Sequence, residues 1–179
     1  RLKAGLDADG WPIAMDVRTA MQEGGFGPDA SFNDRSRYHV PNYRYSNHTT
    51  KFHVPVGTRR GIGQAAHEFY RESFMDELAR AAGKDPYQYR RELIARTNLP
   101  YKADMIKALD MAAEMSGWGT ALPRDTARAI ALEERGAETD GMATISAMVH
   151  PVSVSRDGKV KLLRAGVAAI SAHTNADVA

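Results

Sequence analysis

The chain has 179 residues, with 24 lysines and arginines against 22 aspartates and glutamates, and it contains no cysteine. A formal net charge of +2 without any polybasic run argues against a dedicated nucleic-acid-binding protein. The lack of cysteine excludes disulfide bonds, thiolate zinc sites, iron–sulfur ligation by this chain and a cysteine nucleophile.

Two extended runs around Asp9 and Gly10 open the chain. Apolar residues alternate along the second run at Ile13, Met15 and Val17, which predicts a β-hairpin. A loop rich in glycine is predicted to follow, over residues 22–36.

Extended segments continue after this loop. The stretch "YHVPNYRY" places Pro41 and Asn42 between aromatic and β-branched residues, which predicts an extended piece containing a turn. The stretch "TTKFHVPVG" then predicts a short strand that leads into a second glycine-rich loop.

A helix is predicted directly after this second loop, beginning after Gly63. Gly83 stands where a left-handed C-terminal cap belongs, so the helix is expected to end there. The residues that share its expected apolar face are Ala66, Phe69, Tyr70, Phe74, Leu78 and Ala81. Those on its expected polar face are Glu68, Arg71, Glu72, Asp76 and Arg80.

Two further helices are predicted after Gly83. Asp85, Pro86 and Gln88 supply an N-cap, a first-turn proline and a capping-box partner, which predicts a helix over residues 86–96. After a break at Pro100, apolar residues at helical spacing predict a third helix over residues 102–116, ending at Gly117.

From Ala129 onward the apolar residues follow the period of β-strands. Asp157 and Gly158 predict a hairpin turn, and Pro151 within the preceding strand favours an edge strand or a bulge. The predicted fold is therefore mixed α+β, with an N-terminal β-hairpin and loop, a central three-helix segment and a C-terminal β-hairpin.

The loop "GTRRGIG" is the most informative short stretch for function. Its glycines allow close approach of the backbone, and two arginines before a helix N-terminus favour an anion. The alternative is a sharp turn with solvated arginines. A phosphate-binding nucleotide loop is a weaker interpretation, because no lysine follows the glycines. From the residues alone, Arg60 is the best candidate for gripping a carboxylate, a phosphate or an oxyanion.

The remaining polar residues suggest no second site. The six histidines contain no HExxH pattern, so no metal ligands are predicted in this chain. Glu72 and Asp76 lie four residues apart, and Asp76 lies four before Arg80, which is typical of ordinary surface ion pairs on a helix.

Six stretches together carry a family resemblance. In order, they are "RLKAGLDADGWPIAM", "YHVPNYRY", "VPVGTRRGIG", "ESFMDELARAAGKDPYQYRRELIA", "AAEMSGWGTALP" and "VSVSRDGKVKLLR". Over roughly residues 1–165 their order and spacing resemble the molybdopterin-binding large subunit of the xanthine dehydrogenase and aldehyde oxidase superfamily. The most similar branch contains isoquinoline 1-oxidoreductase beta subunits and bacterial aldehyde dehydrogenases.

The resemblance implies an interior portion of a much longer subunit that binds a molybdenum–pyranopterin cofactor, in bacteria usually the cytosine dinucleotide form. It implies as partners the remaining molybdopterin-binding polypeptide, a small subunit carrying [2Fe–2S] clusters, and an aldehyde or N-heterocycle as substrate, with no nucleic acid. It also implies that Arg60 is catalytic and stabilises negative charge developing on the substrate. The residues expected to contact the cofactor are Gly57, Arg59, Gly61 and Gly63.

The resemblance also implies a division into lobes. Residues 1–120 are expected to end one molybdopterin-binding lobe, and residues 121–179 to begin a second. The family's upstream glycine-rich motif and its C-terminal catalytic glutamate have no counterpart here, so we expect the chain to be inactive alone. Departures at "EERGAETDGM" and "AISAHTNAD" remove support for cofactor contacts after about Ala131.

Two interpretations from different classes stay open. The first is a fragment or split subunit of a molybdenum-dependent hydroxylase or aldehyde dehydrogenase. The second is a non-catalytic scaffold or small-ligand-binding derivative of the same fold. The chain begins with Arg1 and shows no signal peptide and no apolar run of about 20 residues, so the compartment stays open between bacterial cytoplasm and periplasm.

Overall fold

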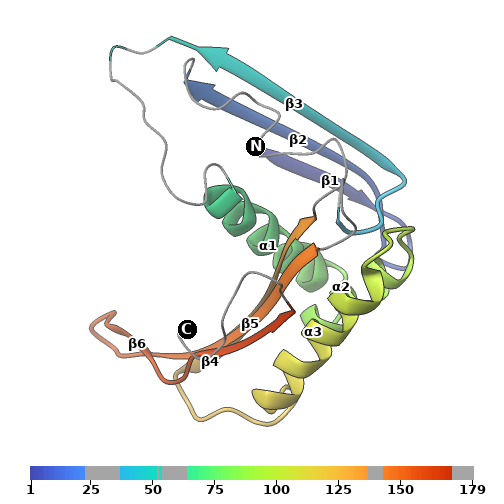
Figure 1. Cartoon of the computed structure of the whole chain (residues 1–179). Helices are drawn as coiled ribbons and strands as arrows, with labels where there is room; N and C mark the ends of the chain where they lie inside the picture. The colour runs from blue at the N-terminus through green and yellow to red at the C-terminus, as the bar shows by residue number, and fades with distance from the viewer. Residues whose placement is uncertain (23–36, 52, 54–63, 137–142, 171–179) are drawn as a thin grey trace. The chain divides into compact units, whose positions relative to one another are not determined.

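A computed structural model describes residues 1–22, 37–51, 53, 64–136 and 143–170. These residues form three helices and seven strands in two sheets, which confirms the predicted α+β class (Figure 1). The contacts divide the chain into two compact units, Arg1–Asp85 and Pro86–Ala179. No helix among the described residues is long and apolar enough to cross a membrane. The expected division into lobes near residue 120 concerns the intact subunit and stays a prediction.

The first unit contains a three-stranded sheet in the order β1-β2-β3 (Figure 1). Strand β1 (Leu2–Leu6) pairs antiparallel with β2 (Pro12–Gln22), which confirms the predicted hairpin. In its turn, the Asp7 carboxylate accepts hydrogen bonds from the backbone nitrogens of Asp9 and Trp11 at 3.0 and 2.7 Å. Gly10 has a φ of +82°, which is why glycine stands there.

Strand β3 differs from the prediction. In place of a turn at Pro41 and Asn42, one continuous strand runs over Asn42–Thr50, parallel to β2. The register pairs Ala14 with Asn42 and Gln22 with Thr50. Of the short strand predicted in "TTKFHVPVG", only the first two residues belong to β3, and most of the rest lies outside the described residues. The pairing with β2 is non-local, so no turn signal near Pro41 could reveal it.

Helix α1 (Gln64–Ala81) begins where predicted. It ends in a Schellman arrangement, in which the amides of Gly83 and Lys84 donate to the carbonyls of Arg80 and Ala79 at 3.0 and 2.9 Å. Gly83 has a φ of +64°, as the predicted left-handed cap requires. The close approach of Ala82 to Gly10 packs this end of the helix against the β1–β2 turn.

The predicted faces of α1 were wrong in part. Phe69 and Tyr70 are 68% and 50% exposed, whereas Glu72 and Asp76 are only 7% and 8% exposed. Buried positions on this helix also include His67, Met75, Leu78 and Ala79. The carboxylates tolerate burial because they have hydrogen-bonding or ionic partners, a condition that the helical period alone cannot reveal.

The second unit begins with helices α2 (Pro86–Ala95) and α3 (Lys102–Met115), which end within one or two residues of the predicted positions. Their fully buried apolar residues are Tyr89, Leu93, Ile94, Met105, Ala108 and Leu109. Helix α3 ends as predicted at Gly117, which has a φ of +63°. The amides of Gly117 and Trp118 donate to Glu114 and Ala113, completing a second Schellman motif.

A four-stranded antiparallel sheet completes the second unit. Its strands are β4 (Thr126–Gly136), β5 (Ala143–Val154), β6 (Val160–Leu162) and β7 (Gly166–Ile170). Strand β5 pairs with β4 on one side, and with β6 and then β7 on the other. The predicted turn between β5 and β6 is present, with Gly158 at a φ of +79°.

Pro151 lies in the central strand of this sheet and not, as predicted, in an edge strand. Its carbonyl accepts a hydrogen bond from the Leu163 amide at 3.0 Å, so its backbone faces the side where β6 ends and β7 begins. A proline lacks an N–H donor, but the ladder on that side is already interrupted there. The position therefore tolerates proline without a bulge.

Arg128 of β4 holds the C-terminal end of α3. Its guanidinium donates to the carbonyls of Ser116 and Gly117 at 2.9 and 2.7 Å and also to the carbonyl of Thr120. It lies 5.8 Å from the centre of the Trp118 ring. A cation at this end of a helix stabilises the unpaired carbonyls and the helix dipole.

Candidate functional site

The residues proposed for the functional site lie in the segment before α1. Arg60, Arg59 and the glycines at positions 57, 61 and 63 all fall outside the described residues. Their assignment as catalytic and cofactor-binding residues therefore stays a prediction. The structure does describe the helix that follows this loop and a polar cluster at its first turns.

An ion-pair cluster occupies the N-terminal half of α1. The Glu68 carboxylate lies 2.6 Å from a guanidinium nitrogen of Arg37 and 3.5 Å from one of Arg71. All three side chains are mostly buried, at 12–15% exposure. In such surroundings a carboxylate is tolerated because opposite charges lie close to it.

A second buried contact lies one turn further along the same helix. The Tyr38 hydroxyl donates to both carboxylate oxygens of Glu72, at 2.9 and 3.1 Å. Tyr38 is 1% exposed, so the pair is enclosed. Together with the ion pairs of Glu68, this contact fixes residues 37 and 38 against the helix that follows the glycine–arginine loop.

Sequence reasoning missed this cluster. The prediction of surface carboxylates was wrong for Glu72 and Asp76, although Asp76 does lie 3.7 Å from Arg80 as an i,i+4 ion pair. The available signal was the spacing of Glu68, Arg71 and Glu72, which places mixed charges on neighbouring positions of a helix. Their distant partners at positions 37 and 38 gave no local sign of the pairing.

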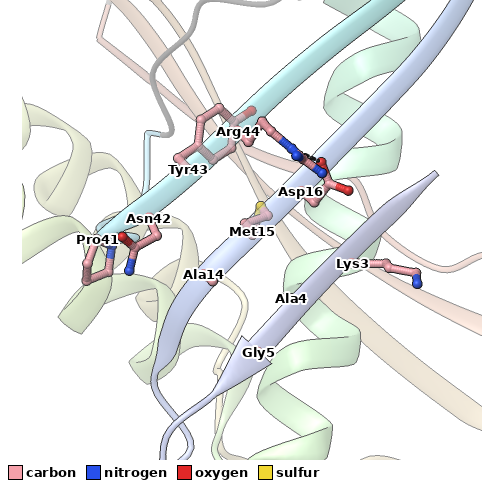
Figure 2. Close-up of a pocket in the computed structure, with 10 residues that line it drawn as sticks. All are labelled: Lys3, Ala4, Gly5, Ala14, Met15, Asp16, Pro41, Asn42, Tyr43 and Arg44. Carbon is pink, nitrogen blue, oxygen red and sulfur yellow. Dashed lines mark hydrogen bonds and ion pairs between the residues drawn. The ribbon is translucent and has the colours of Figure 1, made fainter.

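A hollow of about 600 Å³ lies on the three-stranded sheet (Figure 2). Its small residues include Gly5 and Ala14, which are neighbours in the β1–β2 register. Lys3, Asp16 and Arg44 form the adjacent row across the three strands. The hollow is open to solvent.

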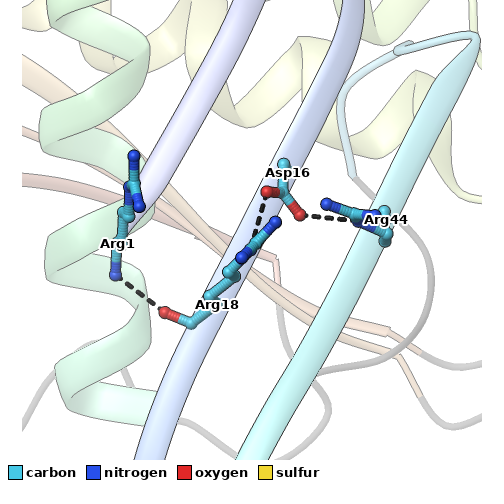
Figure 3. Close-up of polar contacts among 4 residues, drawn as sticks. All are labelled: Arg1, Asp16, Arg18 and Arg44. Carbon is cyan, nitrogen blue, oxygen red and sulfur yellow. Dashed lines mark hydrogen bonds and ion pairs between the residues drawn. The ribbon is translucent and has the colours of Figure 1, made fainter.

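Electrostatics around this hollow centre on Asp16 (Figure 3). Arg44 and Arg18 each donate from Nε to one of its oxygens at 2.8 Å. The Arg44 hydrogen bond is the main reason that the pKa of Asp16 falls from 3.8 to about 2. In Figure 3 the backbone nitrogen of Arg1 also donates to the carbonyl of Arg18 at 2.7 Å, which extends the β1–β2 pairing.

In the second unit, a polar contact links α2 to α3. The Tyr87 hydroxyl donates to Asp110 at 2.7 Å, and Arg91 donates to the same carboxylate at 3.0 Å. Burial and the nearby Asp110 raise the pKa of Tyr87 above 10.0. Through Asp110, the Tyr87 hydroxyl and Arg91 link the two helices.

No group of three or more histidine, aspartate or glutamate side chains suited to a metal ion occurs in the part of the chain that the structure describes. His173 and the segment before α1 lie outside this part. The expectation that this chain supplies no metal ligand therefore remains a prediction.

Comparison with known proteins decides the family. The model of the molybdopterin cofactor-binding domain matches residues 1–93, just over half of the chain. The chain belongs to the molybdopterin cofactor-binding domain family. This confirms the resemblance to the molybdopterin-binding subunits of the xanthine dehydrogenase superfamily.

One curated relative of this family member is a nicotinate dehydrogenase subunit from Pseudomonas putida strain KT2440. It is 29% identical over 134 residues, which cover 65% of this chain and 11% of the relative. The chain therefore spans about a tenth of the length of this relative.

The described residues of this family member meet few of the cofactor's needs. A phosphate-bearing pterin needs backbone donors, close approach and cations that are available to it. On the three-stranded sheet the cations Arg18 and Arg44 already pair with Asp16, and the hollow beside them is open. The three-stranded sheet thus offers no cradle for the cofactor, and we expect the cradle in the segment that contains Arg59 and Arg60.

Proposed function

We propose that this chain is an interior segment of a molybdenum–pterin-dependent hydroxylase or aldehyde dehydrogenase and is inactive alone. The family match over residues 1–93 carries the proposal, because that range contains the whole loop from Gly57 to Gly63. The segment would contribute one wall of the cofactor site, and the remaining molybdopterin-binding polypeptide would contribute the rest.

Within that site, Arg60 would act on the substrate and the neighbouring residues on the cofactor. The bound molybdenum–pyranopterin supplies the oxidation chemistry, and the cytosine dinucleotide form is the one we expect. Gly57, Gly61 and Gly63 would let backbone approach the pterin, with Arg59 beside its negatively charged groups. The planar guanidinium of Arg60 would stabilise charge that develops on the substrate.

The proposed partners follow from the relative. Its name marks it as one subunit of a nicotinate dehydrogenase, which supports a heteromeric assembly for the enzyme containing this chain. Nicotinate is itself an N-heterocycle, which favours an N-heterocycle over an aldehyde as substrate. A small subunit with [2Fe–2S] clusters would receive the electrons, since this chain has no cysteine with which to bind such clusters.

The test is an Arg60→Lys variant in the assembled enzyme, with molybdenum, pterin and turnover measured together. Lysine keeps the charge and loses the planar fork, so we expect turnover to fall by about 10²-fold with unchanged cofactor content. Arg124→Lys is the matched control, because the Arg124 side chain is 86% exposed. Equal loss of molybdenum and turnover would make Arg60 a cofactor anchor.

The second candidate is a non-catalytic scaffold or small-ligand-binding derivative of the same fold. The departures from the family pattern after about Ala131 favour it. An assembled protein that contained neither molybdenum nor pterin, and in which Arg60→Lys changed only stability, would establish this second candidate and remove the first.

A further inference from the structure

The β5–β6 hairpin has one apolar face. The register places Val152 opposite Leu162 and Val154 opposite Val160, so these four side chains lie on the same side of the hairpin. Ser153 and Lys161, the pair between them, lie on the other side.

This apolar face is exposed to solvent. Val160 is 68% exposed, Leu162 55% and Val154 44%. Antiparallel sheets that are solvated on one face normally carry polar residues on that face. Contiguous exposed apolar patches in soluble proteins are often interaction sites.

The same face continues across the sheet. Met148, four residues before Val152 on β5, lies on its side and pairs with Val167, which is 44% exposed. On the opposite face, Ala147 and Val149 are 0% and 1% exposed. The second unit therefore packs one face of this sheet and leaves Val167 and the hairpin side chains exposed on the other.

A buried polar atom on the same face as these apolar residues also lacks a hydrogen-bond partner among the described residues. His150 lies between Met148 and Val152 on this side of β5, and its Nδ1 is buried without a hydrogen-bond partner among the described residues. A buried nitrogen of this kind is normally satisfied in the complete protein. Glu133 of β4, opposite Ser146 of β5, is a charged residue on the same face.

We propose that this face is an interface, and that another part of the molybdopterin-binding subunit covers it, an inference that rests on the proposed function. The chain spans 11% of its relative, so most of a polypeptide of that kind is available to pack here. Permanent interfaces are more apolar than transient ones and resemble the interior of a domain. The valine, leucine and methionine side chains named above fit permanent coverage by an apolar surface.

Thiol labelling tests this assignment, because the chain contains no cysteine. Val160→Cys and Leu162→Cys place a single thiol on the apolar face, and Lys161→Cys places one on the opposite face of the same strand. We expect all three thiols to be alkylated at similar rates in the chain alone. In the assembled enzyme, the thiols at positions 160 and 162 should be alkylated at least about 10-fold more slowly than in the chain alone. The alkylation rate at position 161 should not change.

Equal rates for the three thiols in the assembled enzyme would overturn the proposal. Protection in the chain alone that grows with protein concentration would also overturn it, because a second copy would then cover the face. If a substitution prevents assembly, hydrogen exchange of residues 160–167 in the unaltered chain and in the assembled enzyme gives the same comparison. Labelling needs no molybdenum, so protection without cofactor would leave this inference standing while the proposed function fell.

Discussion

The Tyr38 hydroxyl donates to both oxygens of the Glu72 carboxylate, at 2.9 and 3.1 Å, across 34 residues of sequence. Both side chains are buried, so water does not readily replace this hydrogen bond when it is lost. Tyr38→Phe removes the donor and leaves a buried carboxylate with one partner fewer. We expect the free energy of unfolding of the chain to fall by about 1.5–3 kcal/mol, measured by urea denaturation.

Tyr70→Phe is the control for this experiment. Tyr70 lies on the same helix and is 50% exposed, so loss of its hydroxyl should change stability by less than about 0.5 kcal/mol. Similar effects of the two substitutions would show that the Tyr38 hydroxyl contributes nothing specific.

The pKa of Asp16 offers a second prediction. It lies at about 2, below the ordinary 3.8, and the hydrogen bond from Arg44 is the largest cause. Arg44→Gln should therefore raise this pKa toward 3.8, and Arg18→Gln should raise it less, as measured by NMR titration of the carboxyl carbon. A larger effect of Arg18→Gln would show that Arg18, and not Arg44, lowers the pKa of Asp16 most.

The sign of the stability effect follows from the same pKa. Asp16 is more acidic in the folded chain than in the unfolded one, so its ion pairs stabilise the folded state fully above about pH 4. This contribution is lost as the pH falls from 3.8 through about 2. Both arginines are more than half exposed, so added salt should raise the pKa of Asp16.

Gly10→Ala is expected to destabilise the first unit for two reasons. The φ of +82° disfavours any residue with a Cβ, and the new Cβ would lie 2.6 Å from that of Ala82. Gly83→Ala meets only the first cost, because its φ is +64° and no atom lies within 4 Å. We expect about 1 kcal/mol for Gly83→Ala and at least about 1 kcal/mol more for Gly10→Ala, from urea midpoints. Equal costs would mean that the β1–β2 turn and the end of α1 do not pack tightly.

Arg128→Lys should loosen the C-terminal end of α3. Lysine retains the charge but cannot reach the carbonyls of Ser116, Gly117 and Thr120 together. Amide exchange over residues 116–120 should accelerate, with a loss of about 1 kcal/mol of stability. Arg124→Lys, at an exposed side chain, should leave both quantities unchanged. Unchanged amide exchange in Arg128→Lys would mean that the Schellman motif alone stabilises the C-terminal end of α3.

The elements set by local signals could be predicted from the sequence. Gly83 and Gly117 ended helices, and Asp157 with Gly158 turned a hairpin, because each acts through the backbone of its nearest neighbours. The boundaries of α2 followed from Pro86 and the capping residues in the same way.

Features that depend on distant residues could not be predicted. The sequence predicted Glu72 at the surface, but the fold buries it against Tyr38. The sequence predicted a turn at Asn42, but the fold pairs this residue with β2. Burial of charge and parallel pairing are both decided by tertiary contacts, which override local propensity.

For the candidate site too, some features could be predicted from the sequence and others only from the fold. Family resemblance pointed to Arg60 and its glycines, and the family match supports the cofactor class without testing those residues. The clustering of Arg37, Glu68 and Arg71 emerged only from the fold. Three charged residues have no sequence pattern that distinguishes a buried cluster from a solvated one.

The parallel pairing of β2 with β3 has a consequence for the order of folding. Asp16 and Arg44, neighbours in this pairing, are 28 residues apart, whereas the β1–β2 hairpin and α1 form from contacts close in sequence. Closing a longer loop costs about 0.6 kcal/mol for each doubling of its length, and non-local contacts slow folding. We therefore expect strand β3 to join its sheet after the hairpin has formed. Until then the edge of β2 is open to any other extended segment, so the time that β3 takes to arrive sets the interval in which a refolding chain can mispair.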